Sequence, residues 1–343
     1  FDGDITGTGA SELEVNDSVS GNTLTLGGTG NNFSTLDIQN GTVTLTGDLA
    51  NATDVNLAAT TSVFDLGGND ETIDQLDGVS DSSVTLGGDG TLIVDGGTFD
   101  GDITGTGASE LEVNDSGSGN TLTLSGTGNN FFTLDIQSGT VSLSGDLDNA
   151  TDVTLAAASS ILDLDGNDET IDKLDGTEGS VTLGNATLTL GLSTDSSFSG
   201  DIEGTGGITL NAPTVNESLT LGGSNSYTGT TTITSGTLIS GANDVLDDES
   251  DLDLSGGANS AFNLAGNNET IDQLNGSTGA SVELTGANAG GQLTAKGGTY
   301  AGDIAGDADS RLIMDGAGNT LNLTGGANSS FSGEMTVSAG TIR

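Results

Sequence analysis

The 343-residue chain contains no cysteine, no histidine and no tryptophan, and its one proline is Pro213. Without cysteine it can form neither disulfides nor thiolate metal sites. Without histidine, Ser-His-Asp catalysis and imidazole ligation are excluded. The four basic residues, Lys173, Lys296, Arg311 and Arg343, lie far apart in the sequence. Lyases that act on acidic sugars need basic groups close together, so we expect that the chain is not an enzyme.

Positive charge is almost absent, since 50 acidic residues stand against four basic ones and the net charge is −46. This balance disfavours binding to nucleic acids and to anionic membranes. No run of about 18 apolar residues is present, so we expect no membrane contact by this segment. The electrostatics favour a cationic partner, or an acidic partner bridged by cations.

What the chain does have is a long internal repeat. The segment Phe1–Gly78 returns at 99–176 with 64 of its 78 positions identical, a third copy opens at Phe198 and a fourth at Tyr300. The predicted copies, each of about 100 residues, are 1–98, 99–197, 198–299 and a partial 300–343. Near-identity over this length suits an element that sets length better than a catalytic one.

Apolar residues recur within each copy as short alternating runs, such as Leu13-Glu14-Val15, Leu24-Thr25-Leu26 and Val43-Thr44-Leu45. Alternation of this kind predicts half-buried strands, and disorder does not require it. Clusters of Gly, Asn, Asp and Ser between the runs predict turns. A conventional globule of this size needs more large side chains to fill its core. These observations favour a solenoid with a narrow apolar strip.

Short strands separated by frequent turns fit either an antiparallel sandwich or a parallel β-helix. The apolar runs span only three or four residues, and aromatics make up 3% of the chain. Both features favour the β-helix, because a sandwich usually needs longer strands and aromatic residues at its centre. We therefore predict an all-β fold, a single continuous parallel β-solenoid over 1–343. The number of strands in each turn is left open.

The segment Leu219–Leu238 reads LTLGGSNSYTGTTTITSGTL. It resembles the passenger-associated repeat of bacterial autotransporters, L-T-L-x-G-x-N-x-Y-x-G-x-T-x-I-x-x-G-T-L. Three further segments, Phe64–Leu76, Leu162–Leu174 and Phe262–Leu274, resemble the companion stretch L-x-G-x-N-x-x-T-I-x-x-L. The resemblance implies a right-handed parallel β-helix held outside the cell, on the bacterial outer surface.

Carboxylates gather in two glycine-rich turns, and Ca²⁺ prefers such oxygen ligands. The candidate calcium ligands are Asp163, Asp165, Asn167 and Asp168 in the first turn and Asp247, Asp248 and Asp251 in the second. Neither group matches an EF-hand loop or a calcium-binding nonapeptide. Solvated carboxylates that bind ions diffusely are the competing interpretation. No cofactor is required, but Ca²⁺ is expected to stabilise so acidic a chain.

Neither end of the sequence resembles a solenoid cap. Phe1 begins in the same register as Phe99, and the last residues, 340–343, include no divergent polar turn. Uncapped solenoid ends expose strand edges. Two explanations stay open: the chain is a window on a longer array, or copies of the chain stack end to end.

The sequence therefore predicts an extracellular structural stalk or fibre of the bacterial surface. Its expected partners are copies of itself, end to end or lateral and bridged by cations, and surface or matrix ligands. An alternative is a Ca²⁺-stabilised autotransporter adhesin that binds a surface ligand. A distant third is a carbohydrate-active β-helix, which would need carboxylates and aromatics gathered in one groove.

Overall fold

The computed structural model describes residues 1–17, 21–115, 119–214, 216–286, 290–325 and 330–343. Its contacts divide the chain into two compact units, Phe1–Asp165 and Gly166–Arg343. The boundary falls inside the second copy, so the units do not coincide with the repeats. The single continuous solenoid over 1–343 stays a prediction.

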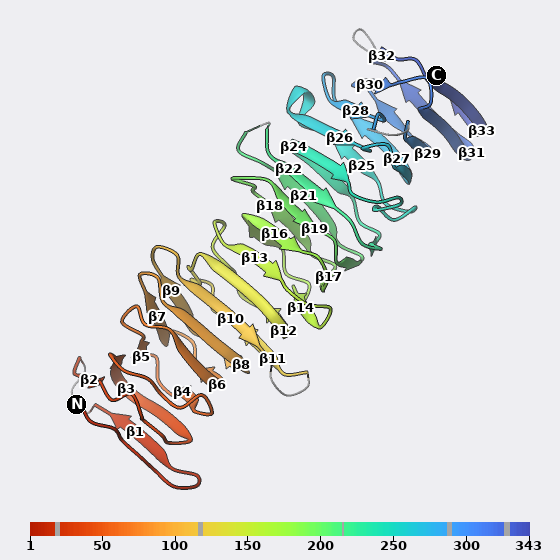
Figure 1. Ribbon diagram of the computed structural model, residues 1–343. Coiled ribbons are helices and arrows are strands. Elements are labelled where there is room, and N and C mark those ends of the chain that lie inside the picture. The colour runs from red at the N-terminus through yellow and green to blue at the C-terminus, as the bar shows by residue number, and fades with distance from the viewer. Residues whose placement is uncertain (18–20, 116–118, 215, 287–289, 326–329) are drawn as a thin grey trace. The chain divides into compact units, whose positions relative to one another are not determined.

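Strands account for nearly all regular structure in both units (Figure 1). The strands of the first unit are β1 Glu12–Asn16, β2 Thr23–Leu26, β3 Thr35–Leu45, β4 Asp54–Leu57, β5 Ser62–Asp65, β6 Glu71–Gly78, β7 Ser83–Gly87, β8 Thr91–Phe99, β9 Asp102–Gly105, β10 Glu110–Asn114, β11 Thr121–Leu124, β12 Thr133–Leu143, β13 Asp152–Leu155 and β14 Ser160–Asp163.

The second unit continues the strand numbering and includes one short 3₁₀ helix, η1 Gly257–Asn259. Its strands are β15 Glu169–Ile171, β16 Lys173–Gly176, β17 Ser180–Gly184, β18 Thr187–Leu190, β19 Ser196–Phe198, β20 Asp201–Gly204, β21 Gly207–Asn211, β22 Ser218–Leu221, β23 Ser226–Tyr227, β24 Thr231–Ser240, β25 Leu252–Leu254, β26 Ser260–Asn263, β27 Asn268–Gly276, β28 Ser281–Glu283, β29 Gln292–Tyr300, β30 Asp303–Gly306, β31 Arg311–Leu323, β32 Ser330–Phe331 and β33 Glu334–Ile342.

Three parallel ladders build the first unit, which answers the question of strands per turn. The first ladder runs through β1, β3, β4, β6, β8, β11, β12 and β14. The second runs through β2, β3, β5, β7 and β9, and the third through β6, β8, β10, β12 and β13. The longer strands β3, β6, β8 and β12 bend at a corner, so their two halves belong to different ladders.

Each turn of the first unit takes about 19 to 25 residues, as the pairs Leu36–Val55 and Gly97–Leu122 show. β1 and β10 have the same sequence, ELEVN, but lie in different ladders: β1 shares the first ladder with β11, and β10 belongs to the third. The 98 residues that separate them are therefore not a whole number of turns. The two near-identical copies present the same residues on different faces of the solenoid.

The core of the first unit consists of the apolar residues that point inward at every second position of the strands. Leu36, Ile38, Val43 and Leu45 of β3 are fully buried, and their paired residues on neighbouring turns are apolar as well. Side chains at successive strand positions point to opposite faces, so the residues between them face outward. Stacking a few aliphatic side chains per turn explains how a chain with so few aromatics forms a core.

The second unit repeats this plan with three parallel ladders. They run through β17, β20 and β23; through β16, β19, β22, β24, β26, β28, β30 and β32; and through β15, β18, β21, β24, β25, β27, β29, β31 and β33. The all-β parallel solenoid predicted from the sequence is confirmed. The right-handed winding stays a prediction.

Candidate functional site

Carboxylates at the corners of the first unit bind the backbone of the next turn. Asp70 Oδ1 accepts the Thr91 N–H at 3.0 Å, and Asp77 Oδ1 accepts the Thr98 N–H at 2.8 Å. In the second unit, Asp195 Oδ1 accepts the Ser218 N–H at 2.8 Å. A charged acceptor strengthens such a bond and satisfies a donor that the bent strand leaves open. Part of the acidic charge therefore holds successive turns together.

The residues of the first candidate calcium turn belong to different units. Asp163 and Asp165 end the first unit, where Asp163 Oδ1 accepts the Asp165 N–H at 2.9 Å. Asn167 and Asp168 open the second unit, and Asp168 Oδ1 accepts the Thr187 N–H at 2.7 Å. The carboxylates of Asp163 and Asp168 thus accept backbone bonds of their own turn or the next.

The second candidate turn lies within the second unit. Asp247 Oδ1 accepts the Glu249 N–H at 2.9 Å, and the main-chain oxygen of Asp248 accepts a bond from Lys296 Nζ at 2.6 Å. Partial burial and the neighbouring Asp272 raise the pKa of Asp251. In the part of the chain that the structure describes, no three acidic, histidine or cysteine side chains form a group that could hold a metal ion. Calcium binding by these seven residues stays a prediction.

A buried asparagine joins three successive turns in each copy where the structure describes it. Asn225 is 7% exposed; its Oδ1 accepts the Ile202 N–H at 2.8 Å, and its Nδ2 donates to the carbonyls of Gly222 and Val245. Asn31 and Asn129 of the first unit make the equivalent bonds. Each of these asparagines is a structural bridge. The sequence indicates asparagine in turns but does not predict its burial.

A buried glutamate is the second feature that the sequence did not predict. Glu71 Oε2 accepts the Leu49 N–H at 3.0 Å, and burial raises the pKa of Glu71 to about 7, with Asp48 adding to the shift. Glu269 is 1% exposed and accepts the N–H groups of Val245 and Leu246; burial raises its pKa to about 8, and Asp244 adds to the shift. The signal that could have located them is their shared place before Thr-Ile-Asp.

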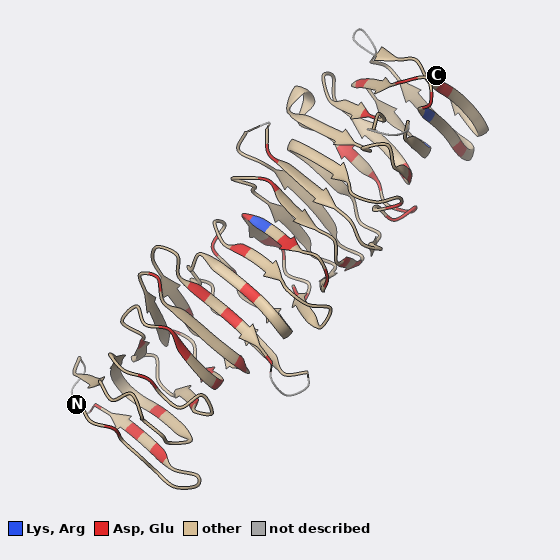
Figure 2. Cartoon of the chain, in the orientation of Figure 1, with Lys and Arg blue, Asp and Glu red and all other residues tan. Residues whose placement is uncertain are grey.

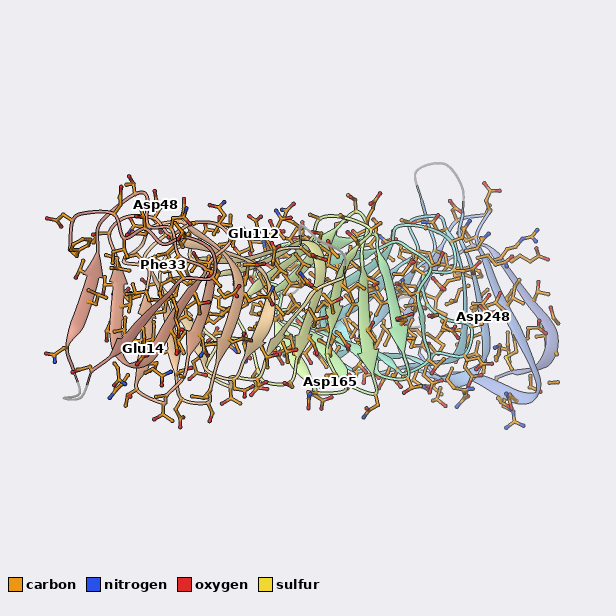
Figure 3. All side chains as sticks on the ribbon, turned by 90° about the horizontal axis from the view of Figure 1, so that it is seen from below. Glu14, Phe33, Asp48, Glu112, Asp165 and Asp248 are labelled. Carbon is orange, nitrogen blue, oxygen red and sulfur yellow. The ribbon has the colours of Figure 1, made fainter. Side chains whose placement is uncertain are left out.

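Outward positions carry most of the remaining charge, as Figure 2 shows for both units. Glu14 of β1 is exposed and pairs with Asp37 of β3, whereas Phe33 is 4% exposed (Figure 3). All four basic residues follow Gly166, so the first unit has none. The outer surface of the first unit therefore attracts cations without any competing Lys or Arg of its own.

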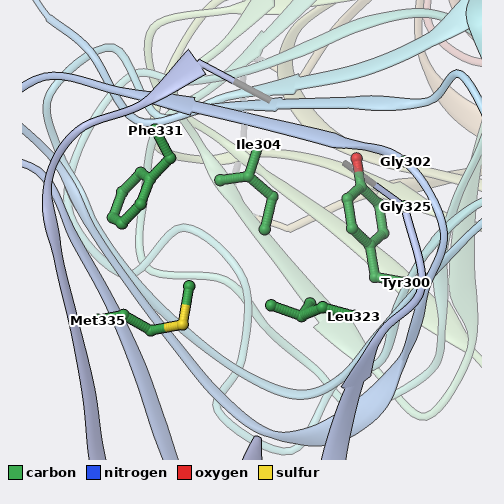
Figure 4. Close-up of a pocket in the computed structure, with 7 residues that line it drawn as sticks. All are labelled: Tyr300, Gly302, Ile304, Leu323, Gly325, Phe331 and Met335. Carbon is green, nitrogen blue, oxygen red and sulfur yellow. The ribbon is translucent and has the colours of Figure 1, made fainter. Parts of the chain in front are cut away.

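The last turn of the second unit leaves apolar surface open. A cavity of about 260 Å³ is lined by Tyr300, Ile304, Leu323, Phe331 and Met335, together with two glycines (Figure 4). Met335 is 48% exposed in β33, whereas its paired residue Leu312 in β31 is fully buried. Met335 and the cavity lining therefore leave apolar side chains exposed in this part of the second unit.

The family model for the passenger-associated-transport-repeat matches residues 217–239 and 312–343. The first match contains Leu219–Leu238, which confirms the resemblance read from that segment. The second was not singled out from the sequence, although Phe331 and Gly340 repeat the spacing of Tyr227 and Gly236. No curated protein and no solved structure matches the chain.

Proposed function

We propose, from the premise that this chain carries the passenger-associated transport repeats of an autotransporter passenger domain, that it serves as a structural stalk on the bacterial outer surface. The observation that carries this proposal is the placement of the repeat's own residues. Asn225 lies in the matched segment, and all three of its side-chain hydrogen bonds serve to join three successive turns. The repeat thus supplies the means to extend a solenoid, and we assign the chain no catalytic role.

The surface location can be tested on intact cells. An epitope inserted at Val79, which is 39% exposed in a turn, should be removed by externally added protease while the cells stay whole. A cytoplasmic marker protein serves as the control and should survive. Protection of the epitope in intact cells, with cleavage only after lysis, would contradict the proposal.

We further propose that copies of the chain associate end to end, and strands β1 and β33 support this association. β10 pairs with β8 on one side and with β12 on the other, and Leu111 and Val113 of β10 are fully buried between them. β1 has the same sequence and pairs with β3, yet Leu13 and Val15 are only half-buried. A strand that paired with β1 in the way that β8 pairs with β10 would cover Leu13 and Val15.

β33 has the sequence pattern to be that strand in a second molecule. β8 reads TLIVDGGTF and β33 reads EMTVSAGTI, so Met335 and Val337 stand where β8 has Leu92 and Val94. Met335 and Val337 are about half exposed, at 48% and 50%. Pairing β33 with β1 of the next molecule would bury these side chains against Leu13 and Val15.

Val337→Lys tests this association, because it puts a charge on the inward face of β33. The outward Thr336→Lys is the matched control, and light scattering after size-exclusion chromatography measures the molar mass. We expect concentration-dependent assemblies for the wild type and for Thr336→Lys, and monomers for Val337→Lys. A monomeric wild type at all accessible concentrations would contradict the stacking and leave the stalk proposal intact.

A further inference from the structure

One aromatic side chain in the interior of the sequence lies on the outer surface of the first unit. Phe132 is 49% exposed, whereas its neighbour Phe131 is 3% exposed. Phe131 therefore packs in the core, and Phe132 presents its ring to solvent. Isolated exposed apolar residues are common. The exposure of Phe132 therefore indicates a binding site only if the neighbouring residues form one.

The ring borders a small pocket formed where three consecutive turns stack. The turn between β9 and β10 contributes Thr106 and Ser109, the next turn contributes Asn130 and Phe132, and the third contributes Asp148, around a volume of about 120 Å³. Backbone bonds hold the turns together. The Gly105 N–H donates to Asn130 O at 2.7 Å and the Phe132 N–H to Ser109 O at 3.0 Å, and the Asp152 N–H of the third turn donates to Phe132 O at 2.9 Å. Three connected turns give the pocket a fixed frame.

Asp148 is oriented by a bond within its own turn. Its Oδ1 accepts the Ala150 N–H at 2.9 Å, and its main-chain oxygen accepts the Thr151 N–H at 2.9 Å. The side chain is half-buried. A carboxylate therefore stands in the same pocket as an exposed aromatic ring.

The first copy offers a natural comparison, since it has the same pocket frame without these two groups. Phe132 and Asp148 correspond to Ser34 and Ala50, 98 residues earlier. The other residues that frame the pocket, including Thr106, Ser109 and Asn130, are identical in the first copy. The second copy thus differs by the addition of one ring and one negative charge at a single place.

We propose that the Phe132–Asp148 pocket binds a cationic side chain, a guanidinium or an ammonium group, of a partner protein. An aromatic face attracts a cation that lies within about 6 Å of the ring centre, and a carboxylate beside the ring supplies a charged acceptor. The first unit contains no Lys or Arg, so no basic residue of its own unit competes for the pocket. The surrounding acidic surface also concentrates cations near it.

A neutral sugar is the competing ligand, because sugars also stack on aromatic rings. A phenylalanine ring offers no hydrogen bond, and Asp148 already uses Oδ1 within its own turn. The charge of Asp148 adds more to the binding of a cation than to that of a neutral hydroxyl. The observations therefore favour the cation, and the sugar becomes an outcome of the test.

The chain has no tryptophan, so Phe132→Trp places a single fluorescent reporter in the pocket while keeping an aromatic face. The probe is acetyl-arginine methylamide, titrated in 150 mM NaCl, and its neutral isostere acetyl-citrulline methylamide is the control. We expect a saturable fluorescence change with the arginine probe and at least a fivefold weaker response with citrulline. Adding Asp148→Ala should weaken arginine binding to the level of citrulline.

The first copy supplies the matched gain-of-function control. Ser34→Trp alone should respond weakly, and Ser34→Trp with Ala50→Asp should recover the response of the second copy. To check the natural phenylalanine, backbone amide shifts of residues 105–109 should move on adding the arginine probe to the wild type, and should not move in Phe132→Ser. Equal responses to arginine and citrulline, indifference to Asp148→Ala, or saturation by glucose instead of arginine would each overturn the proposal.

Discussion

The first unit and the second unit reach the same architecture from sequences of different character. The first is made mainly of two near-identical stretches and has no basic residue, whereas the second holds the divergent copies, all four basic residues and both family-model matches. Both nevertheless bury an asparagine that joins three turns, Asn129 in one and Asn225 in the other. The fold depends on inward and corner residues, and the outer residues are free to change.

The largest expected effect comes from removing that asparagine in either unit. Asn129→Ala or Asn225→Ala leaves one N–H and two carbonyls without their partner in a buried place. Each change should lower the free energy of unfolding of its own unit by about 3 kcal/mol. Urea unfolding measures the loss, and hydrogen exchange assigns it to a unit. The exposed Asn268→Ala is the control and should change stability by less than about 0.5 kcal/mol.

If only one of the two substitutions were destabilising, the shared role of the asparagine would be wrong. A comparable loss in Asn268→Ala would show that the effect does not come from burial.

Corner glycines provide the next comparison. Gly97 has φ +132°, and a Cβ there would lie 2.1 Å from Leu76 O; Gly298 of the second unit has φ +125°, and its Cβ would lie 2.1 Å from Leu274 O. Alanine at either position should cost about 2 kcal/mol. Gly88 has open space around it, so Gly88→Ala should be close to neutral. Thermal unfolding of the three variants checks this order, and a stable Gly97→Ala would contradict the tight corner.

The buried glutamates should make the pH response of the units differ. A folded-state pKa of about 7 for Glu71 and about 8 for Glu269, against 4.5 in the unfolded chain, means that the folded state holds the proton more tightly. Their contribution to stability is present below pH 4.5 and is lost as the pH rises, through pH 7 in the first unit and through pH 8 in the second.

Glu269→Gln removes the titrating charge but turns one of the two accepting oxygens into an NH2 group, so it should lower stability at pH 5 and flatten the pH dependence of the second unit. Unfolding curves at pH 5, 7 and 9 measure the change, with Glu283→Gln on the outer surface of β28 as the control. A steeper pH dependence in Glu269→Gln would contradict the assignment.

Added salt should produce the smallest difference in stability between the two units. The first unit has no Lys or Arg to offset its carboxylates, so added salt should protect its amides from exchange more than those of the second unit. If Ca²⁺ binds at defined sites, millimolar CaCl₂ should raise the melting temperature by several degrees more than NaCl of equal ionic strength. Equal effects of the two salts would leave only screening.

Much of the fold could be predicted from the sequence, because strand alternation and turn composition are local signals. The runs at Leu24–Leu26 and Val43–Leu45 lie in β2 and β3, as expected. The joining of Leu36 and Val43 into one bent strand was not predicted. It depends on Gly41, whose φ of +99° lets the chain turn a corner without ending the ladder.

The parts that could not be predicted depend on residues brought together from different turns. Asn225 follows a glycine-rich segment between β22 and β23, and Glu269 is the second residue of β27; only the stacking of turns buries these two polar side chains. The carboxylates of the acidic turns look available for ions in the sequence. The structure shows that Asp70 and Asp168 instead accept backbone N–H groups of the next turn, which a sequence cannot reveal. The pocket at Phe132 was not predicted either, because its residues come from three turns.

The most direct test of the parallel three-ladder solenoid is disulfide formation between paired outward positions, which the absence of cysteine makes free of background. Glu112 and Asp135 are partners in β10 and β12, and Thr209 and Thr232 are partners in β21 and β24. Neighbouring strands lie about 4.8 Å apart, which is within reach of a disulfide. Cysteines at either pair should cross-link rapidly under mild oxidation, and Glu112→Cys with Asp37→Cys should not. Cross-linking of that third pair, or failure of the first two, would contradict the account.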